Sequence, residues 1–378
     1  MKKGAVFEEV AADSAAQAPT RATPPRRASG GARGPIAAWL WTLAALVVVM
    51  ILVGGLTRLT DSGLSITIWD PVMGAIPPLS DADWEEAFAL YQTTTEFQEQ
   101  NHWMTLDDFK PIYWWEWGHR QLGRFIGLVW AVGLGAFLAL RLVPKGWTGR
   151  LVIPGLLGGV QGAIGWWMVS SGLVGRLDVA SYRLATHLGL AFVILGLLVW
   201  YARRIVLEET EVLQARRRRT LQGKGLLLAF ASLGFLQILV GALVAGIDAG
   251  RGYPDWPLML GQFIPPDPMI LDPWWRNFFE NAGTVQFVHR MLGYLVLLVG
   301  LAAGWALWRR REAAIRWHGA AIALGVLAQT VIGIVTVIHA APLEIAIWHQ
   351  GGAVVLTMIT VSALFALAYP PHTKIRAT

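Results

Sequence analysis

The chain has 378 residues, of which 55% are apolar and only 15% are charged, a composition typical of a polytopic membrane protein and not of a soluble domain. It contains no cysteine, which excludes disulfides, iron–sulfur clusters, thiolate-ligated haem and covalently attached c-type haem. Any metal or haem ligand must therefore be His, Met, Tyr or a carboxylate. The net charge of +6 comes from Lys and Arg clusters that we interpret as topology signals, so no nucleic-acid partner is expected.

Residues 1–35 are rich in Ala, Pro and Arg but have no apolar core, so this segment is not a secretory signal. Two interpretations remain open, a disordered cytoplasmic tail and an organellar transit peptide. Transit peptides avoid acidic residues, whereas this segment contains Glu8, Glu9 and Asp13. The acidic residues favour a disordered cytoplasmic N-terminal tail.

Eight apolar runs follow, each close to the roughly 20 residues that a bilayer-spanning helix requires. They cover residues 36–58, 117–140, 151–171, 184–202, 226–247, 284–308, 317–338 and 345–369. We predict an all-α membrane protein with eight transmembrane helices, arranged as two pseudo-symmetric four-helix bundles. The predicted parts are an N-terminal bundle at 36–204, a basic cytoplasmic linker at 205–225, a C-terminal bundle at 226–370 and a cytoplasmic tail at 371–378.

Lys and Arg residues indicate the orientation, because they are enriched in the loops on the cytoplasmic side. With the N-terminus inside, most of the 31 Lys and Arg residues fall on inner segments, including the runs at 216–219 and 309–311. The outer segments hold only Lys110, Arg176, Arg183, Arg251 and Arg276. We therefore predict that the N-terminus and the C-terminus are both cytoplasmic.

A pentapeptide, His-Arg-x-Leu-Gly, occurs at residues 119–123 and again at residues 289–293. Other signals recur in the same order in the two halves, namely Gly54 with Gly241, Gln161 with Gln329, and His187 with His349. Each half contains four predicted helices. Because four is an even number, the two repeats run parallel, related by an axis along the membrane normal.

Four histidines, His119, His187, His289 and His349, lie near the predicted outer ends of their helices, two in each half. Two histidines on facing helices of a four-helix bundle can hold a planar haem through two axial ligands. The alternative is a set of core histidines with satisfied hydrogen bonds, but their pairing by repeat and by depth favours ligands. The remaining histidines lack this pattern and are interpreted as non-ligands: His102, His318, His339 and His372.

One difference between the halves concerns acid–base chemistry. Glu116 lies three residues before His119 and shares its helix face, whereas the matching residue before His289 is Gln286. A carboxylate beside a bound substrate can transfer protons or stabilise positive charge. The alternative is a structural ion pair with Arg120 at i+4. We predict that Glu116 is catalytic, that the N-terminal half is reactive and that the C-terminal half is an electron-transfer site.

Arginines near the outer helix ends are predicted contacts for haem propionates, because a guanidinium offers paired donors to a carboxylate. These residues are Arg58, Arg120, Arg124 and Arg290. The alternative is that they reach the membrane interface without a ligand. The outer loop at 59–115 is long and aromatic, and we expect it to cover the N-terminal site as a lid. Within it, Thr105 and Asp108 have the spacing of a helix cap.

These motifs together resemble the haem A synthase family over residues 36–370. The matching strings lie at residues 54–65, 71–78, 104–110, 114–120, 286–290 and 348–350, and Trp-Trp-Glu-x-x-His-Arg at 114–120 is highly specific. Many bacterial members carry a cysteine pair in an outer loop, which this chain lacks. The chain therefore resembles the cysteine-free alphaproteobacterial and mitochondrial branch, which excludes a thiol-based electron relay and leaves the electron acceptor open.

The resemblance implies an oxidoreductase that acts on a CH group. Its reaction is the oxidation of the C8 methyl of haem O to a formyl group by successive hydroxylations, giving haem A for terminal oxidases. The resemblance further implies that His119 and His187 bind the iron of the substrate haem, and that His289 and His349 bind one permanent haem b in the C-terminal half. Glu116 is then the carboxylate required for turnover.

The expected location is the bacterial inner membrane, as a multi-pass protein, with the mitochondrial inner membrane as the alternative. The expected partners are membrane lipid, the haem O synthase as a donor of substrate, assembly factors of terminal oxidases and a second copy of the chain in a homo-oligomer.

Two other functions remain open from the residues alone. A bis-His b-type electron carrier linked to quinone would not modify haem, and it would not need Glu116 in only one half. A haem exporter or chaperone would release the haem of the N-terminal pair chemically unchanged.

Overall fold

The computed structural model describes residues 32–219 and 221–370, and apart from one isolated β-bridge all regular structure within them is helical. Eight of these helices are long and apolar enough to cross a membrane. They are α1 (Arg33–Leu59), α3 (Leu106–Ala139), α4 (Thr148–Val169), α5 (Ser181–Ile205), α7 (Lys224–Gly246), α9 (Ala282–Trp308), α10 (Ala313–Ile338) and α11 (Leu343–Ala368). The prediction of an all-α membrane protein with eight spans is confirmed.

The outward faces of the spans are apolar. Examples are Leu128 and Val132 of α3, Leu298 of α9 and Leu324 of α10, each of which is more than half exposed. A large exposed apolar surface on helices of this length is suited to lipid, because every backbone group inside a helix is already hydrogen-bonded.

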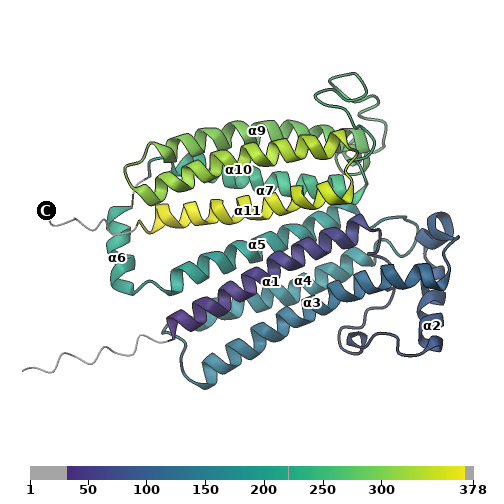
Figure 1. Ribbon diagram of the computed structural model, residues 1–378, viewed down its shortest axis with the longest axis horizontal. Helices are drawn as coiled ribbons and strands as arrows, with labels where there is room; N and C mark the ends of the chain where they lie inside the picture. Colours follow the sequence, from purple (N-terminus) through teal and green to yellow (C-terminus); the bar gives the residue numbers. More distant parts are fainter. Residues whose placement is uncertain (1–31, 220, 371–378) are drawn as a thin grey trace, which may run out of the picture.

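Contacts between the spans form two rings of four helices. In the first ring α1 contacts α3, α3 contacts α4, α4 contacts α5, and α5 contacts α1; the second ring repeats this order with α7, α9, α10 and α11. The two rings lie side by side, from purple to teal and from teal to yellow along the chain (Figure 1). This arrangement fits the predicted pair of four-helix bundles.

The boundary between the two rings repeats its own contacts. The last span of the first half, α5, packs on the first span of the second half, α7. In the same way the last span of the second half, α11, packs on the first span of the first half, α1. A Cβ added to Gly189 of α5 would lie 2.6 Å from Leu239 of α7, and one added to Gly351 of α11 would lie 3.7 Å from Leu52 of α1. Such reciprocal contacts fit the predicted pseudo-symmetry of the two halves.

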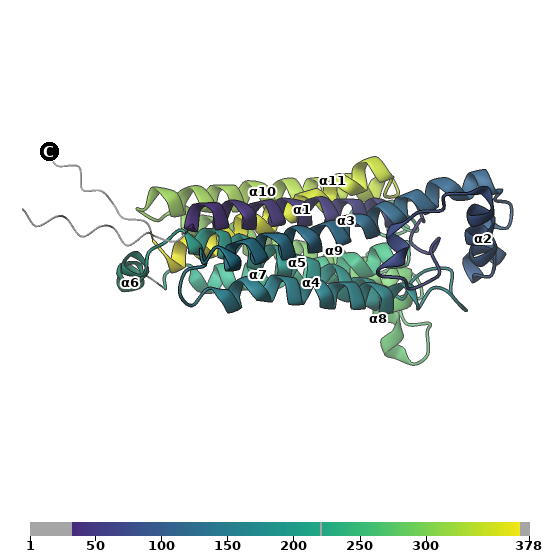
Figure 2. The same ribbon diagram turned by 90° about the horizontal axis from the view of Figure 1, so that it is seen from below.

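Helix α3 differs most from its predicted span, because it begins at Leu106 and not near residue 117. The predicted cap is confirmed: the Asp108 carboxylate accepts from the Thr105 backbone N–H at 2.9 Å, and the Thr105 hydroxyl accepts from the Asp108 N–H at 3.4 Å. The added turns bury Phe109 and Tyr113 beside α2 (Asp81–Gln92), outside the membrane-spanning run. Figure 2 shows α3 extending past the other spans toward α2.

The other described helices are short and lie in the connections: α6 (Glu209–Arg218), α8 (Asn277–Glu280), η1 (Met73–Ala75), η2 (Phe97–Asn101) and η3 (Trp274–Arg276). Helix α6 occupies the predicted linker and runs across the ends of the spans (Figure 1). The predicted tail at 371–378 lies outside the described residues, as does the predicted N-terminal tail up to residue 31, while residues 33–35 belong to α1.

Candidate functional site

His289 of α9 and His349 of α11 face each other across the ring of the second half, with their ring centroids 6.4 Å apart. When two imidazoles bind the same metal atom from opposite sides, each through a ring nitrogen at about 2 Å, their ring centroids lie roughly 6 Å apart. The two predicted ligands therefore have the spacing of two axial ligands of one haem iron. His119 of α3 and His187 of α5 occupy the matching places in the first half.

Each of the four imidazoles lies against a glycine of a neighbouring helix. A Cβ added to Gly54 would lie 3.4 Å from His119, and one added to Gly241 would lie 3.1 Å from His289. The other two pairs are tighter, at 2.9 Å between Gly165 and His187 and 2.8 Å between Gly333 and His349. A side chain at any of these glycines would press on the ring. The notch that each glycine leaves in its helix therefore determines where the imidazole lies. This cradle fits the demand of a bis-His haem for fixed axial ligands.

Three of the histidines also contact a glutamine amide. Gln161 lies 3.1 Å from His187 Nδ1, and Gln329 lies 3.3 Å from His349 Nδ1. Gln237 lies 3.2 Å from both ring nitrogens of His289. Each amide also donates to the backbone carbonyl of the same histidine, at 2.9, 2.8 and 3.0 Å respectively. A partner on the second ring nitrogen fixes the orientation of an axial histidine. The three amide oxygens are buried without a partner among the described residues.

His119 has no such glutamine. Met50 stands at the position in the first half that is equivalent to Gln237 in the second. The terminal methyl of Met50 would lie 3.5 Å from a Cβ added to Gly123, and the Gln237 amide would lie 3.3 Å from a Cβ added to the equivalent Gly293. No hydrogen bond joins the His119 ring to any residue within 32–219 or 221–370. Sequence reasoning missed this difference, although the offset from Gly54 to Gly241 leads directly from Met50 to Gln237.

Glu116 is buried on α3, with only 2% of its surface exposed, and all its acceptor positions are used. One carboxylate oxygen accepts from Arg120, with the shorter contact at 2.6 Å. The other oxygen accepts from the Ser65 hydroxyl and the Ile66 N–H, both at 2.8 Å. The ion pair that the sequence offered as the structural alternative is therefore present, and it holds the first outer loop against α3.

The second half repeats this frame without the negative charge. The Gln286 amide oxygen accepts from Arg290 at 3.0 Å, and Arg290 also donates to the carbonyls of Tyr253 and Leu258, each at 2.8 Å. The buried Gln286 amide nitrogen has no partner within the described residues. Glu116 and Gln286 thus take equivalent places, and the carboxylate is confined to the half that contains His119.

The arginines predicted as propionate contacts are all engaged within the protein. Arg120 donates to the carbonyls of Ile66 and Ile68, and Arg124 donates to those of Asp70 and Pro71. With Arg290, they fasten the connections that follow α1 and α7 to α3 and α9. These contacts are compatible with a loop that covers the first-half site, and a propionate contact stays a prediction.

Arg58 forms a cluster of its own at the C-terminal end of α1. Its guanidinium contacts Asp61 at 2.7 Å, and Asp178 and Asp248 at 3.1 Å each, so it ties the two halves together. The three carboxylates lie close enough to hold a metal ion, but Arg58 already provides their cation. Near them Glu96 is buried with one unpartnered oxygen. Burial, followed by the charges of Asp61 and Asp178, raises the pKa of Glu96 to about 8.

The other histidines do not join the two pairs. His318 and His339 contact carbonyls within α10, those of Ala314 and Val335. His102 lies in the outer loop after η2, and His372 lies outside the described residues.

Comparisons with known proteins show the family of this chain. The chain matches the model of a family described as cytochrome oxidase assembly protein over residues 37–361. It is 57% identical to the haem A synthase of Ruegeria pomeroyi, covering 99% of each chain. It is 56% identical to that of Dinoroseobacter shibae, covering 99% of this chain and 98% of the relative, and 52% identical to that of Roseobacter denitrificans, covering 100% and 99%. The chain therefore belongs to the haem A synthase family.

Proposed function

We propose that the chain oxidises haem O to haem A, converting the C8 methyl to a formyl group, and that this reaction takes place in the first half. In this proposal His119 and His187 bind the iron of the substrate haem, and His289 and His349 bind one haem b. The observation that carries the division is Glu116, which stands in a hydrogen-bond frame that the second half fills with Gln286.

The glutamines support the same division. Both histidines of the second half are held by an amide, through Gln237 and Gln329, as suits a haem that stays bound. In the first half only His187 is held in this way, through Gln161, whereas the position equivalent to Gln237 is Met50, which has no amide to offer His119. A less restrained ligand suits a haem that must enter as substrate and leave as product.

Haem iron supplies the one-electron and oxygen chemistry when it is bound. The protein then contributes position and charge. Glu116 lies one helical turn from His119, where its carboxylate can stabilise positive charge at the carbon being oxidised or accept a proton released from it. Arg120, Ser65 and the Ile66 N–H keep that carboxylate in place, and the loop they anchor limits the access of water.

The surroundings are proposed from the fold and the family. The eight spans make this a multi-pass membrane protein, and we propose the bacterial inner membrane with both termini cytoplasmic. The bundles proposed at 36–204 and 226–370 would be joined by the linker that contains α6. A haem O synthase is the proposed donor of substrate, oxidase assembly factors the proposed recipients, and a homo-oligomer the proposed assembly.

The decisive experiment is chromatography and mass analysis of the haems extracted from the purified protein. Haem b together with haem O, haem A or a hydroxylated intermediate is the expected result. Haem b alone, from cells supplied with haem O, would contradict the proposal and indicate an electron carrier in which Glu116 only pairs with Arg120.

A further inference from the structure

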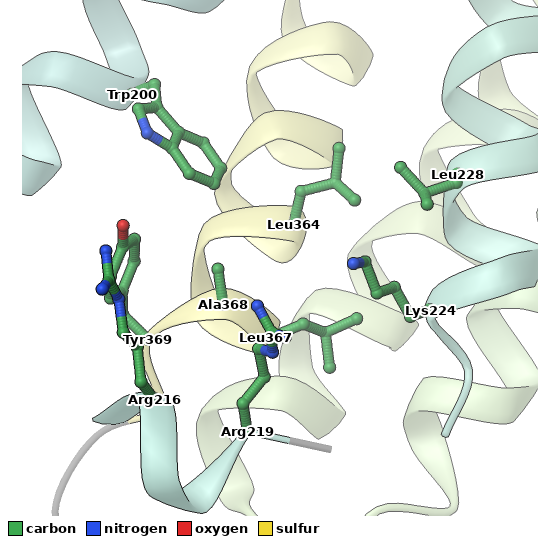
Figure 3. A pocket seen from close by; sticks show the side chains of 9 residues that line it. All are labelled: Trp200, Arg216, Arg219, Lys224, Leu228, Leu364, Leu367, Ala368 and Tyr369. Atoms are coloured by element: carbon green, nitrogen blue, oxygen red, sulfur yellow. The ribbon is translucent and has the colours of Figure 1, made fainter. Parts of the chain in front are cut away.

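A cavity of about 620 Å³ opens at the end of the molecule that carries α6, away from the histidine pairs. Its walls come from both halves, because the lining residues lie on α5 of the first half, on α7 and α11 of the second half and on α6 between them, or directly follow α6 and α11. The lining residues are Trp200, Arg216, Arg219, Lys224, Leu228, Leu364, Leu367, Ala368 and Tyr369 (Figure 3).

The charge of this cavity is positive. Arg216, Arg219 and Lys224 supply three cations, and the lining contains no acidic residue. Two other arginines at this end have an acidic partner: Arg204 contacts Glu209 at 3.0 Å, and Arg310 contacts Glu312 at 2.9 Å. The three cations of the cavity have no acidic partner within the described residues. A basic cavity without internal counter-charge is suited to an anion.

The rest of the lining is apolar. Leu228, Leu364 and Leu367 face the space from α7 and α11, and Trp200 faces it from α5 (Figure 3). Trp200 is held by an edge-on contact with Phe365, at 5.2 Å between ring centroids, and by a tilted contact with Tyr369, at 6.0 Å. Inorganic phosphate would satisfy the cations but leave this apolar wall without a partner.

The cations and the apolar wall are arranged along the membrane normal. Lys224 is the first residue of the span α7, and Arg216 and Arg219 lie on α6 and at its end, which crosses the ends of the spans. Leu228 and Leu364 lie about one helical turn further into the spans. An amphiphile with an anionic head at the surface and acyl chains below it matches this order.

We propose that this cavity binds an anionic phospholipid of the bilayer, with the phosphate among Arg216, Arg219 and Lys224 and the upper acyl chains along Trp200, Leu228 and Leu364. Because its walls come from both halves, the lipid would join the two bundles at the end opposite the Arg58 cluster.

The test uses the full-length protein, delipidated in detergent and supplied with equal amounts of phosphatidylglycerol and phosphatidylcholine, with bound lipid counted by native mass spectrometry. The wild type is expected to retain phosphatidylglycerol preferentially. The variant R216Q/R219Q/K224Q is expected to lose this preference, binding phosphatidylglycerol at least about tenfold more weakly. The control R309Q/R311Q/R316Q removes the same charge from the α9–α10 connection and the start of α10, at the same end, and is expected to behave as the wild type.

A second variant covers the case in which the triple variant fails to fold. Leu364→Trp fills the cavity without changing charge, and it is expected to reduce retention of phosphatidylglycerol while haem content is unchanged. Equal retention of the two lipids by the wild type would overturn the proposal. Equal losses in the triple variant and its control, or displacement of the lipid by inorganic phosphate, would overturn it as well.

Discussion

Glu116 and Gln286 occupy equivalent places in the two halves and differ only in that one carboxylate oxygen is replaced by an amide nitrogen. Both side chains accept a hydrogen bond from the arginine four residues later, and both lie next to a loop that the arginine anchors. The carboxylate offers two oxygens and finds donors for both, whereas the amide leaves its nitrogen without an acceptor. The second half therefore shows that a loop anchored by the arginine forms without a negative charge at this position.

From this it follows that Glu116→Gln should fold and bind haem but lose most of its activity. We expect haem A formation to fall by about a hundredfold or more, because the charge near the reacting carbon is removed while the shape is kept. Haem extraction with mass analysis measures this. Gln286→Glu is the matched control and should retain activity; near-normal haem A output from Glu116→Gln would refute the catalytic role.

Glu96 gives a prediction about pH. Its pKa of about 8 in the fold, against an ordinary value of 4.5, means that protonated Glu96 stabilises the fold at low pH. This contribution is lost as pH rises from about 4.5 through about 8, because over this range the carboxyl ionises in the unfolded chain, whereas burial and the charges of Asp61, Asp178 and Glu116, opposed by Arg58, keep it protonated in the fold. The free energy of unfolding of the wild type should fall over this window.

Glu96→Gln removes that pH dependence, since its amide stays neutral. Relative to the wild type, it should gain stability on going from pH 5 to pH 8.5, on the order of a few kcal/mol. Thermal unfolding in detergent at the two pH values measures this difference. Glu99→Gln changes an exposed carboxylate of the same segment and should follow the wild type. A constant difference between Glu96→Gln and the wild type across the window would show that Glu96 is already ionised.

At the scale of elements, the position of each histidine ring depends on a neighbouring helix as well as on the helix that carries the histidine. Gly54 and Gly241 come from the first helix of each half, and Gly165 and Gly333 from the third. Periodicity identifies each helix as a span but does not say which neighbour it meets. The contacts between glycine and imidazole depend on the ring order of the four helices.

Gly165→Ala should therefore displace the His187 ring, because the added Cβ would lie 2.9 Å from it. We expect retention of haem O to fall by roughly tenfold while haem b in the second half is kept. Spectra and extracted haem content report the two haems separately. Gly162→Ala, on the same helix with nothing within 4 Å of its added Cβ, is the control. Loss of haem from both variants, or from neither, would contradict the role of the notch.

At the scale of the whole molecule, the two halves meet through reciprocal contacts of α5 with α7 and α11 with α1. The Arg58 cluster joins the halves at one end through Asp248, and α6 connects them at the other. Both described ends of the chain lie at the α6 end (Figure 1). One orientation in the membrane therefore decides the location of the basic segments and of the four histidines together.

The orientation itself can be tested with reporter fusions. A reporter enzyme that is active only in the cytoplasm, fused after residue 213 in α6, should be active, because the basic residues of this connection favour the inner side. The same reporter fused after residue 99 in the outer loop should be silent. Silence at residue 213 with activity at residue 99 would reverse the topology, and with it the proposed outer position of the haem sites.

Some features of this protein follow from the sequence by itself. The apolar runs determine eight spans because each must satisfy its backbone inside lipid, and the recurring His-Arg motif predicts the duplication and the histidine pairs. The early start of α3 escaped hydropathy, since its outer turns bury aromatic side chains against α2 and not against lipid. Only the tertiary structure decided that Gln237 meets His289 and that Arg58 joins carboxylates from both halves. These contacts join residues distant in the chain, and they depend on which helices pack together and at what rotation, which local patterns do not encode.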